Sequence, residues 1–336
     1  MLLIDAVYIN VGGGKVLLDY LIEELEKTSA PIVYLFDRRI EEIHPVIKKS
    51  NTVFYIEAGL LGRFKFYKTN KNTFEKVLCF GNIPPTIAQN CEVITYFHNP
   101  MYLNVPEDFN LIEKFKYFLK VLIIKLLKNS TTWWVQSDLI KTSFINKYKV
   151  SEGKVIIKPF YPPFRDLITN FLVRKKFSYL YVSNATPNKN HIRLLEAFCA
   201  FYEKYHLGEL TVTVSNDYPK VLKAIDDKIA LGYPIINTGF IKRDDLKLLY
   251  LQNEYLVFPS LAESFGLGLV ESIENGCKVL GSDLPYTYAV CEPSLVFNPY
   301  DVESIYNAFT KTIVDDLKPS FSKIKNGIND LIDILV

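Results

Sequence analysis

The feature that most constrains the fold is a regular alternation of short apolar runs with longer segments of helical spacing. The first run, Leu2–Ile9, is followed by glycines and then by Lys15–Lys27, where apolar residues recur every three or four positions. Strands alternating with helices predict an α/β chain with parallel sheets covered by helices on both faces. The predicted strands are Leu2–Ile9, Pro31–Phe36, Val53–Ile56, Lys76–Cys79, Val93–Phe97, Trp133–Gln136, Lys154–Ile157, Phe177–Val182, Leu210–Val214, Ile235–Asn237, Tyr255–Phe258, Lys278–Gly281 and Leu295–Phe297.

A proline-rich stretch, Pro159-Phe-Tyr-Pro-Pro163, interrupts this series and reads as a linker, because proline cannot continue a helix. The 336 residues suffice for two domains of ordinary size. We therefore predict two doubly wound, Rossmann-like domains, residues 1–160 and 166–315, facing each other across a cleft. A helical tail, 316–336, is expected to pack back on the N-terminal domain. Open sheets of this kind bind ligands at the carboxyl ends of their strands.

The charge of the chain is unevenly distributed. The net charge is only +2, which gives no case for nucleic acid as a partner. Residues 1–165 contain 22 basic against 16 acidic residues, whereas the remainder contains 17 against 21. The basic first half is therefore expected to meet an anionic partner.

Cysteine usage and the N-terminus predict a cytoplasmic protein. The five cysteines are scattered and form no C-x-x-C pair, which favours reduced thiols. Met1–Ile9 lacks the basic region and cleavage site of a signal peptide. No stretch reaches the roughly 20 apolar residues of a membrane span.

Two carboxylates flank a glycine-rich turn in Glu263-Ser-Phe-Gly-Leu-Gly-Leu-Val-Glu271, which follows an apolar run and enters a segment of helical spacing. Gly266 and Gly268 let the backbone approach a ligand at the start of that helix. Free amides and the helix dipole favour an anion there. This arrangement suits a ligand with a phosphate in the middle and hydroxyl groups at both ends, which is the shape of a nucleotide sugar.

A second glycine-rich segment, Gly12-Gly-Gly14-Lys15, follows the first predicted strand and opens the first helix. This position predicts a phosphate cradle with Lys15 as a charge partner; a tight strand-to-helix turn is the alternative. The segment is not a Walker A loop, and Leu17 occupies the third glycine position of G-x-G-x-x-G. Asp37, at the end of the second strand, resembles the ribose-binding acid of a dinucleotide fold and keeps an NAD-dependent enzyme open as an alternative.

Two further polar groups follow predicted strands. His98, in Tyr96-Phe-His-Asn-Pro100, is placed to bond a sugar hydroxyl or a reacting group, or else a loop carbonyl. Lys189, in the loop that begins at Asn184, is placed to neutralise a diphosphate, and a surface lysine is the alternative. No cluster with metal-ligand spacing surrounds His98.

Two segments of the first half, Gly59–Lys76 and Leu111–Lys128, combine basic residues with aromatic and apolar ones. Both are candidates for contact with a membrane surface that carries anionic lipid, on the inner face of the cell membrane. The second fits equally well an ordinary core-facing helix with solvated lysines.

Together these residues resemble the nucleotide-sugar glycosyltransferases of the GT-B fold, specifically the large retaining family called glycosyl transferases group 1 (family 4). The resemblance extends over nearly the whole chain and is strongest over Val182–Phe297. The segments that carry it are Val182-Ser-Asn-Ala-Thr-Pro-Asn-Lys-Asn190, Thr238-Gly-Phe-Ile241, Leu249-Tyr250, Val257-Phe-Pro-Ser260, Glu263–Glu271, Gly276-Cys-Lys-Val-Leu-Gly-Ser-Asp283, Phe297-Asn-Pro299, Val135-Gln-Ser137 and the first glycine loop.

The resemblance implies a role for each site residue. The residues implied at the reacting centre are Glu263, His98 and Lys189. The residues implied in binding the donor's sugar, diphosphate, ribose or base are Gly13, Gly14, Lys15, Asn184, Gly239, Phe240, Ile241, Phe265, Gly266, Leu267 and Glu271. Among these, Glu271 would hold the ribose hydroxyls, Lys189 would neutralise the diphosphate, and the Gly239–Ile241 loop would contact the nucleobase.

The chain departs from the family at Asn184, where a basic residue, usually arginine, is the rule, so the phosphate site has one charge fewer. Similar enzymes need no metal, because the protein's cations and helix ends carry the leaving diphosphate. We therefore expect no metal or other cofactor beside the nucleotide-sugar co-substrate. Family members retain the anomeric configuration, with the acceptor attacking the face that the nucleotide leaves, so Glu263 is not assigned as a nucleophile.

These inferences predict a retaining glycosyltransferase that moves a sugar from a nucleoside diphosphate to a saccharide, expected to be lipid-linked, in bacterial surface polysaccharide synthesis. The acceptor is expected on the first domain and the donor on the second. The change at Asn184 leaves a second hypothesis open, a catalytically silent relative that binds a nucleotide sugar as a scaffold.

Overall fold

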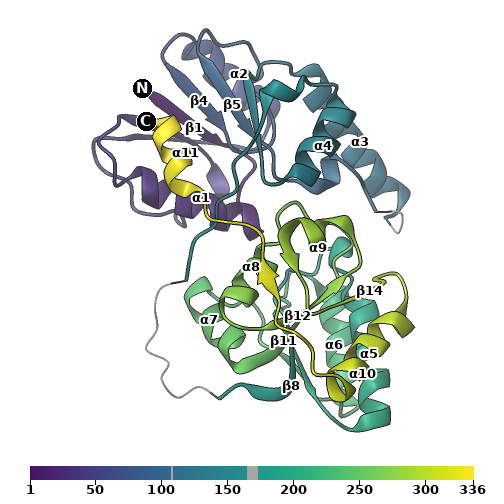
Figure 1. Ribbon diagram of the computed structural model, residues 1–336. Coiled ribbons are helices and arrows are strands. Elements are labelled where there is room, and N and C mark those ends of the chain that lie inside the picture. The colour runs from purple at the N-terminus through teal and green to yellow at the C-terminus, as the bar shows by residue number, and fades with distance from the viewer. Residues whose placement is uncertain (107–108, 165–172) are drawn as a thin grey trace. The chain divides into compact units, whose positions relative to one another are not determined.

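The computed structural model describes residues 1–106, 109–164 and 173–336 of the chain (Figure 1). These divide into two compact units. Unit 1 comprises Met1–Pro162 and Lys325–Val336, and unit 2 comprises Pro163–Ile324. The predicted start of the second domain, residue 166, lies outside the described residues.

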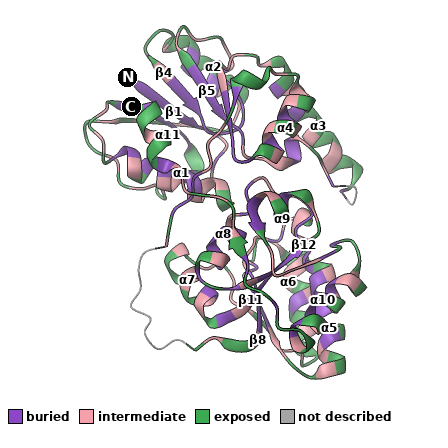
Figure 2. Cartoon of the chain, viewed as in Figure 1, coloured by how far each residue is buried: buried purple, intermediate pink, exposed green. Residues whose placement is uncertain are grey.

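Unit 1 is built on a seven-stranded parallel sheet. Its strands, in spatial order, are β3 (Thr52–Ile56), β2 (Ile32–Asp37), β1 (Leu2–Ala6), β4 (Lys76–Cys79), β5 (Glu92–Tyr96), β6 (Thr132–Val135) and β7 (Val155–Ile157). Its α-helices are α1 (Gly12–Leu25), α2 (Leu60–Thr69), α3 (Leu111–Leu126), α4 (Asp138–Tyr148) and α11 (Ile328–Leu335). Strand β1 is buried along its whole length, as its apolar run predicts for a central parallel strand (Figure 2).

Unit 2 repeats the plan with a six-stranded parallel sheet. Its strands, in spatial order, are β10 (Ile235–Asn237), β9 (Glu209–Val212), β8 (Lys175–Tyr181), β11 (Asn253–Phe258), β12 (Lys278–Ser282) and β14 (Leu295–Phe297). Its α-helices are α5 (His191–Tyr205), α6 (Pro219–Ala230), α7 (Arg243–Gln252), α8 (Leu267–Glu274), α9 (Pro285–Val290) and α10 (Val302–Val314). The α/β fold class is thus confirmed, and each of the thirteen strands of the two sheets coincides with a predicted one to within three residues at either end.

The strand order places one topological switch point in each sheet. In unit 1 the chain runs outward from β1 to β3 and returns to β4 on the other side of β1. In unit 2 it runs outward from β8 to β10 and returns to β11 on the other side of β8. Open parallel sheets bind ligands at such points, outside the carboxyl ends of the strands. The loops that follow β8 and β11 contain Lys189 and Glu263, two of the predicted site residues.

The proline-rich stretch at 159–163, expected to be a linker, contains the boundary between the two units, which falls after Pro162, and its first residues also pack in unit 1. Phe160 is fully buried and packs its ring against Phe80 and Tyr96. The returning chain runs beside it, because the Gly327 amide donates to the Pro159 carbonyl at 3.0 Å. The two aromatic side chains of the stretch favour burial, a signal that its prolines obscured.

The predicted helical tail, residues 316–336, contains a helix only over Ile328–Leu335. Phe321–Ser322 (β15) pairs antiparallel with Cys291–Glu292 (β13) in unit 2, and α11 covers Ile328–Leu335 in unit 1, where it packs beside α1. In the described parts of the chain, no helix combines the length and the hydrophobicity needed to cross a bilayer.

Candidate functional site

A salt bridge joins the two loops at the switch point of unit 2. The Nζ atom of Lys189 lies 2.5 Å from Oε1 of Glu263, and both side chains are largely buried. The backbone fixes the same two loops, since the Leu261 amide donates to the Asn188 carbonyl at 2.7 Å. A cation and a carboxylate are thereby held at the carboxyl ends of β8 and β11, as the sequence predicted.

Helix α8 begins immediately after this pair, at a turn that only glycine fits. Gly266 has φ +65°, and a Cβ there would fall 3.0 Å from Leu269 Cδ1. A Cβ at Gly268 would fall 3.3 Å from the ring of Phe258, so this glycine lets α8 pack closely on β11. Because the first amides of a helix lack intrahelical acceptors, the turn presents N–H groups and a positive dipole end beside Lys189.

Glu271 lies in the second turn of α8 and is buried. Its Oε1 pairs with Arg243, and its Oε2 accepts from the Tyr250 hydroxyl at 3.0 Å. Burial raises the pKa of this carboxyl, and the pairing with Arg243 opposes that shift. The carboxylate is therefore held in one orientation by two groups of α7.

Arg243 is a candidate site residue that the sequence did not indicate. It is the first residue of α7, and its guanidinium lies 4.4 Å from the centre of the Phe164 ring. The sequence signal that could have indicated Arg243 is its position two residues after the Gly239–Ile241 loop. The pairing joins that loop, expected to contact a base, to Glu271, expected to hold a ribose.

The remaining predicted residues of unit 2 lie in the loops that follow β8, β10 and β11, or at the start of α8. Gly239 has φ +68°, and the side chain of Phe240 is 77 % exposed. Asn184 lies in the same loop as Lys189 and accepts from the Thr186 hydroxyl at 3.1 Å. Its uncharged amide leaves Lys189 as the cation that this loop brings to Glu263.

In unit 1 the structure brings Gly14 and His98 together. A Cβ at Gly14 would fall 2.9 Å from His98 Cε1, so the absence of a side chain permits this approach. Nε2 of His98 lies 2.9 Å from the Phe80 carbonyl and 3.3 Å from Nδ2 of Asn82. Burial lowers the pKa of His98 to about 4, and the imidazole is neutral at neutral pH. Among the described residues, apart from its chain neighbours and the backbone of its own helix, no atom lies within 4 Å of a Cβ built at Gly13.

Two charged residues of unit 1 are engaged within the unit. The Lys15 ammonium donates to Asp19 and to the Ile43 carbonyl, at 2.6–2.7 Å. The buried carboxylate of Asp37 accepts from the Arg39 guanidinium at 2.6 and 2.8 Å. Asp37 is thereby paired with a residue of its own unit.

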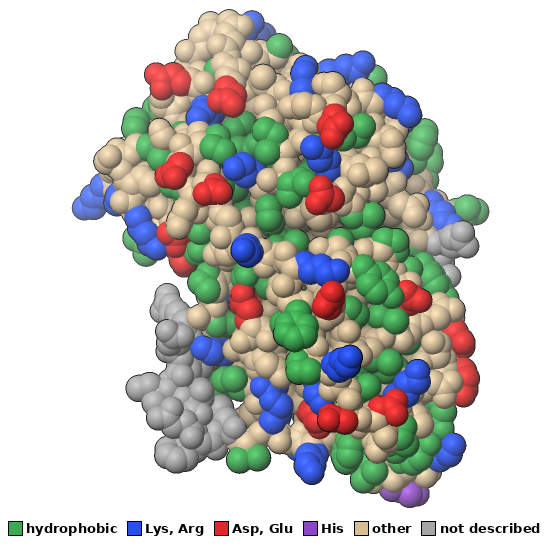
Figure 3. Space-filling view, viewed as in Figure 1, with side chains coloured by type: hydrophobic (Ala, Val, Ile, Leu, Met, Phe, Trp, Pro, Cys, Tyr) green, Lys and Arg blue, Asp and Glu red, His purple; other side chains and the backbone are tan. Residues whose placement is uncertain are grey.

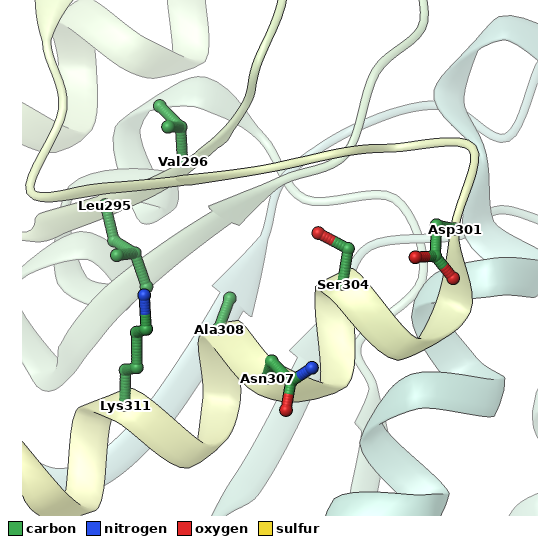
Figure 4. Close-up of a pocket in the computed structure, with 7 residues that line it drawn as sticks. All are labelled: Leu295, Val296, Asp301, Ser304, Asn307, Ala308 and Lys311. Atoms are coloured by element: carbon green, nitrogen blue, oxygen red, sulfur yellow. The ribbon is translucent and has the colours of Figure 1, made fainter.

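A separate pocket of about 240 Å³ lies in unit 2 between β14 and α10. Figure 4 shows its lining, which includes Asp301 and Lys311 but none of the predicted site residues. The charged and glycine-rich features at the switch point therefore mark the better candidate site.

Sequence comparisons identify relatives for this chain. Residues 168–328 match the family model of glycosyl transferases group 1. The chain is 24% identical over 258 residues to the O-antigen chain mannosyltransferase RfbU of Salmonella typhimurium, covering 76% of this chain and 69% of RfbU. It is 39% identical over 135 residues to the serotype-specific mannosyltransferase WbdA of Escherichia coli, covering 39% of this chain but 17% of WbdA.

Solved structures share the fold. WaaG, a glycosyltransferase involved in lipopolysaccharide biosynthesis, aligns over 100% of this chain and 99% of its own, with a TM-score of 0.72 at 15% identity. Sucrose-phosphate synthase from Thermosynechococcus elongatus aligns over 94% of this chain and 89% of its own, with a TM-score of 0.74 at 15% identity. The matched residues contain most of the motifs on which the sequence resemblance rested, although the first glycine loop and Val135–Ser137 precede them. The chain is a glycosyltransferase with the GT-B fold, and its residues 168–328 are similar to the glycosyl transferases group 1.

Proposed function

We propose that the protein transfers a hexose, with retention of anomeric configuration, from a nucleoside diphosphate sugar to a lipid-linked saccharide during assembly of a bacterial surface polysaccharide. RfbU and WbdA are named as mannosyltransferases, which makes a mannosyl donor the first candidate. The name of RfbU refers to O-antigen and the description of WaaG to lipopolysaccharide, which supports a polysaccharide or its lipid-linked precursor as the acceptor.

The observation that carries the proposal is the Lys189–Glu263 pair beside the start of α8. A diphosphate placed there meets the Lys189 ammonium and the amides of the first helical turn. Engagement of Lys189 by the phosphates releases Glu263 to accept hydrogen bonds from hydroxyls of the transferred sugar. As the sugar–phosphate bond breaks, negative charge grows on the diphosphate and these groups stabilise it more strongly.

Glu271 and Arg243 have a complementary role in this proposal. The ribose hydroxyls of the donor bind the carboxylate of Glu271, whose ionised form is favoured by the pairing with Arg243 and opposed by burial, which raises the pKa. The Tyr250 hydroxyl fixes the second carboxylate oxygen. A preorganised acceptor of this kind loses little conformational entropy when the donor binds.

Incubation of the protein with UDP-, GDP- and ADP-linked sugars is expected to release nucleoside diphosphate slowly, at the same rate with and without EDTA. Nucleotide release is measured by ion-exchange chromatography, and the Lys189→Met variant is the control for the site. Release that EDTA abolishes and added Mg²⁺ restores would contradict metal independence. Binding of a donor without turnover under any acceptor would instead support the scaffold hypothesis.

Replacement of Glu271 by Gln is expected to weaken nucleoside diphosphate binding by about 10- to 100-fold, because hydrogen bonds to a charged group are lost. Calorimetric titration with UDP, GDP and ADP measures the change. Glu274→Gln, on an exposed position of the same helix, is the matched control and should bind as the wild type does. Equal affinity of the Glu271→Gln and wild-type proteins would remove Glu271 from the donor site.

A further inference from the structure

The chain enters unit 2 at Pro163, and two residues close to this entry contact the groups that hold Glu271. Phe164 lies against Arg243, whose guanidinium is 4.4 Å from the centre of the Phe164 ring. Arg174 directly precedes β8 and bonds to the last turn of α7. Neither residue belongs to the loops of the candidate site, so their contacts indicate a role that acts through other side chains.

The guanidinium of Arg174 lies where two helices end. Its Nη1 donates to the Tyr250 carbonyl at 2.8 Å and to the Asn253 carbonyl, at the end of α7, and its Nη2 donates to the Asn275 carbonyl, at the end of α8. Carbonyls at the end of a helix lack intrahelical donors and carry the negative end of the helix dipole, which a cation offsets. One side chain therefore fastens α7 to α8, and these two helices contain Glu271 and both of its partners.

Tyr250 connects Arg174 to Glu271 in a single step. Its carbonyl accepts from Arg174, and its hydroxyl donates to Oε2 of Glu271 at 3.0 Å. The side chain of Tyr250 is fully buried, and Cys277 Sγ donates to the same carbonyl at 3.0 Å, so this part of α7 is held in one position. A displacement of the end of α7 would move the hydroxyl away from the carboxylate.

Phe164 contacts both groups that hold the Glu271 carboxylate. Beside the Arg243 guanidinium, its ring lies 5.8 Å from the ring of Tyr250, centre to centre. A guanidinium over an aromatic face is attracted by the quadrupole of the ring, which restricts a long side chain that would otherwise sample several rotamers. The ring thus orients Arg243 toward Oε1 of Glu271, with which Arg243 is paired.

On the face of unit 2 that Figure 3 shows, basic and acidic side chains are interspersed among the described residues. Such a mixed surface favours no partner of one charge. The contacts of Phe164 and Arg174, by contrast, converge from separate points of the chain on a single carboxylate, that of Glu271.

We propose that Phe164 and Arg174 are positioning residues for donor binding, which hold the partners of Glu271 in the arrangement that presents its carboxylate to the ribose. This role rests on the proposed function, because it takes Glu271 as the ribose-binding group. It extends the donor site from the loops at the carboxyl ends of the strands to the segment by which the chain enters unit 2.

The test is calorimetric titration of the full-length protein with UDP, GDP and ADP, each compared with its 2′,3′-dideoxy analogue. Phe164→Leu keeps an apolar side chain but removes the aromatic face, and it should weaken binding of the nucleoside diphosphate about 3- to 10-fold. The dideoxy analogue should bind this variant as it binds the wild type, because it has no ribose hydroxyls for Glu271. Phe321→Leu, at an aromatic residue of unit 2 that is 60 % exposed, is the matched control and should bind both ligands normally.

Arg174→Met should produce the same selective loss, about 10-fold or more, because the ends of both helices lose their shared donor. Arg174→Lys should recover part of the affinity, since its ammonium keeps the charge but replaces only some of the contacts. In the Glu271→Gln background, Phe164→Leu should cause no further loss, because the group that it positions has already been changed. Thermal unfolding followed by circular dichroism verifies that each variant is folded at the temperature of the titration.

Equal weakening of the nucleoside diphosphate and its dideoxy analogue would overturn the positioning role, as would wild-type affinity of both Phe164→Leu and Arg174→Met. Additive losses in Phe164→Leu/Glu271→Gln would also contradict it. The result for Glu271→Gln separates the two proposals. If that variant binds as the wild type does, the donor site itself is wrong, whereas if it alone weakens binding, only the roles of Phe164 and Arg174 are refuted.

Discussion

Lys189→Met is expected to lower kcat/KM for sugar transfer by about 100- to 1,000-fold, mostly through kcat. Loss of one group that stabilises transition-state charge has an effect of this size, and here the charge develops on the leaving diphosphate. We do not expect Asn184 to compensate for the lost positive charge, because its side-chain amide is uncharged and accepts a hydrogen bond from Thr186. Steady-state kinetics with the donor identified in the hydrolysis assay measure it.

The matched control is Lys223→Met, which removes a lysine that pairs with Asp227 on the exposed surface of α6. That variant should transfer sugar at the wild-type rate, since exposed ion pairs contribute little. A kcat/KM of Lys189→Met within roughly threefold of wild type would refute the role given to this lysine. Recovery of most of the rate in Lys189→Arg would support a charge role over a purely structural one.

Arg63→Met is expected to destabilise unit 1 by about 3–5 kcal/mol, the range for breaking a buried ion pair from one side. Arg63 is almost fully buried, and its Nη2 lies 2.6 Å from Oδ2 of Asp5 in the central strand β1. The same guanidinium donates to the backbone carbonyls of Ile83 and Pro84, at 3.0 and 3.1 Å. Its removal leaves a buried carboxylate and two carbonyls without this donor.

Urea unfolding followed by tryptophan fluorescence measures this change specifically. Both tryptophans of the chain lie in β6 of unit 1, so the signal reports that unit rather than the whole protein. Arg38→Met, which breaks an exposed pair with Glu57, is the control and should change the unfolding free energy by less than about 1 kcal/mol. The double variant Asp5→Leu/Arg63→Met removes both charges and should regain part of the lost unfolding free energy, because no unpaired ion remains buried. If Arg63→Met lowered the unfolding free energy no more than the control does, the role given to the buried ion pair would be contradicted.

The sequence by itself determined the strands, the fold class and the segments that form the loops of the candidate site. Apolar runs such as Leu2–Ile9 and Ile235–Asn237 predict strands because buried parallel strands need apolar side chains on both faces. Glycine at 266 predicts a turn because only glycine adopts positive φ beside Leu269 without strain. These are local requirements, and a single stretch of sequence contains all the information that they need.

Tertiary structure alone decided which charged groups meet and which apolar faces are covered. The pairs Asp5–Arg63 and Arg243–Glu271 join residues 58 and 28 positions apart, and no local pattern specifies such partners. Periodicity likewise showed that α3 is apolar, but not that unit 1 covers only one of its faces. The burial of Phe160 within the predicted linker was likewise decided by the surrounding elements. A side chain's neighbours are set by the packing of distant segments, whereas its backbone preference is set by the residue itself.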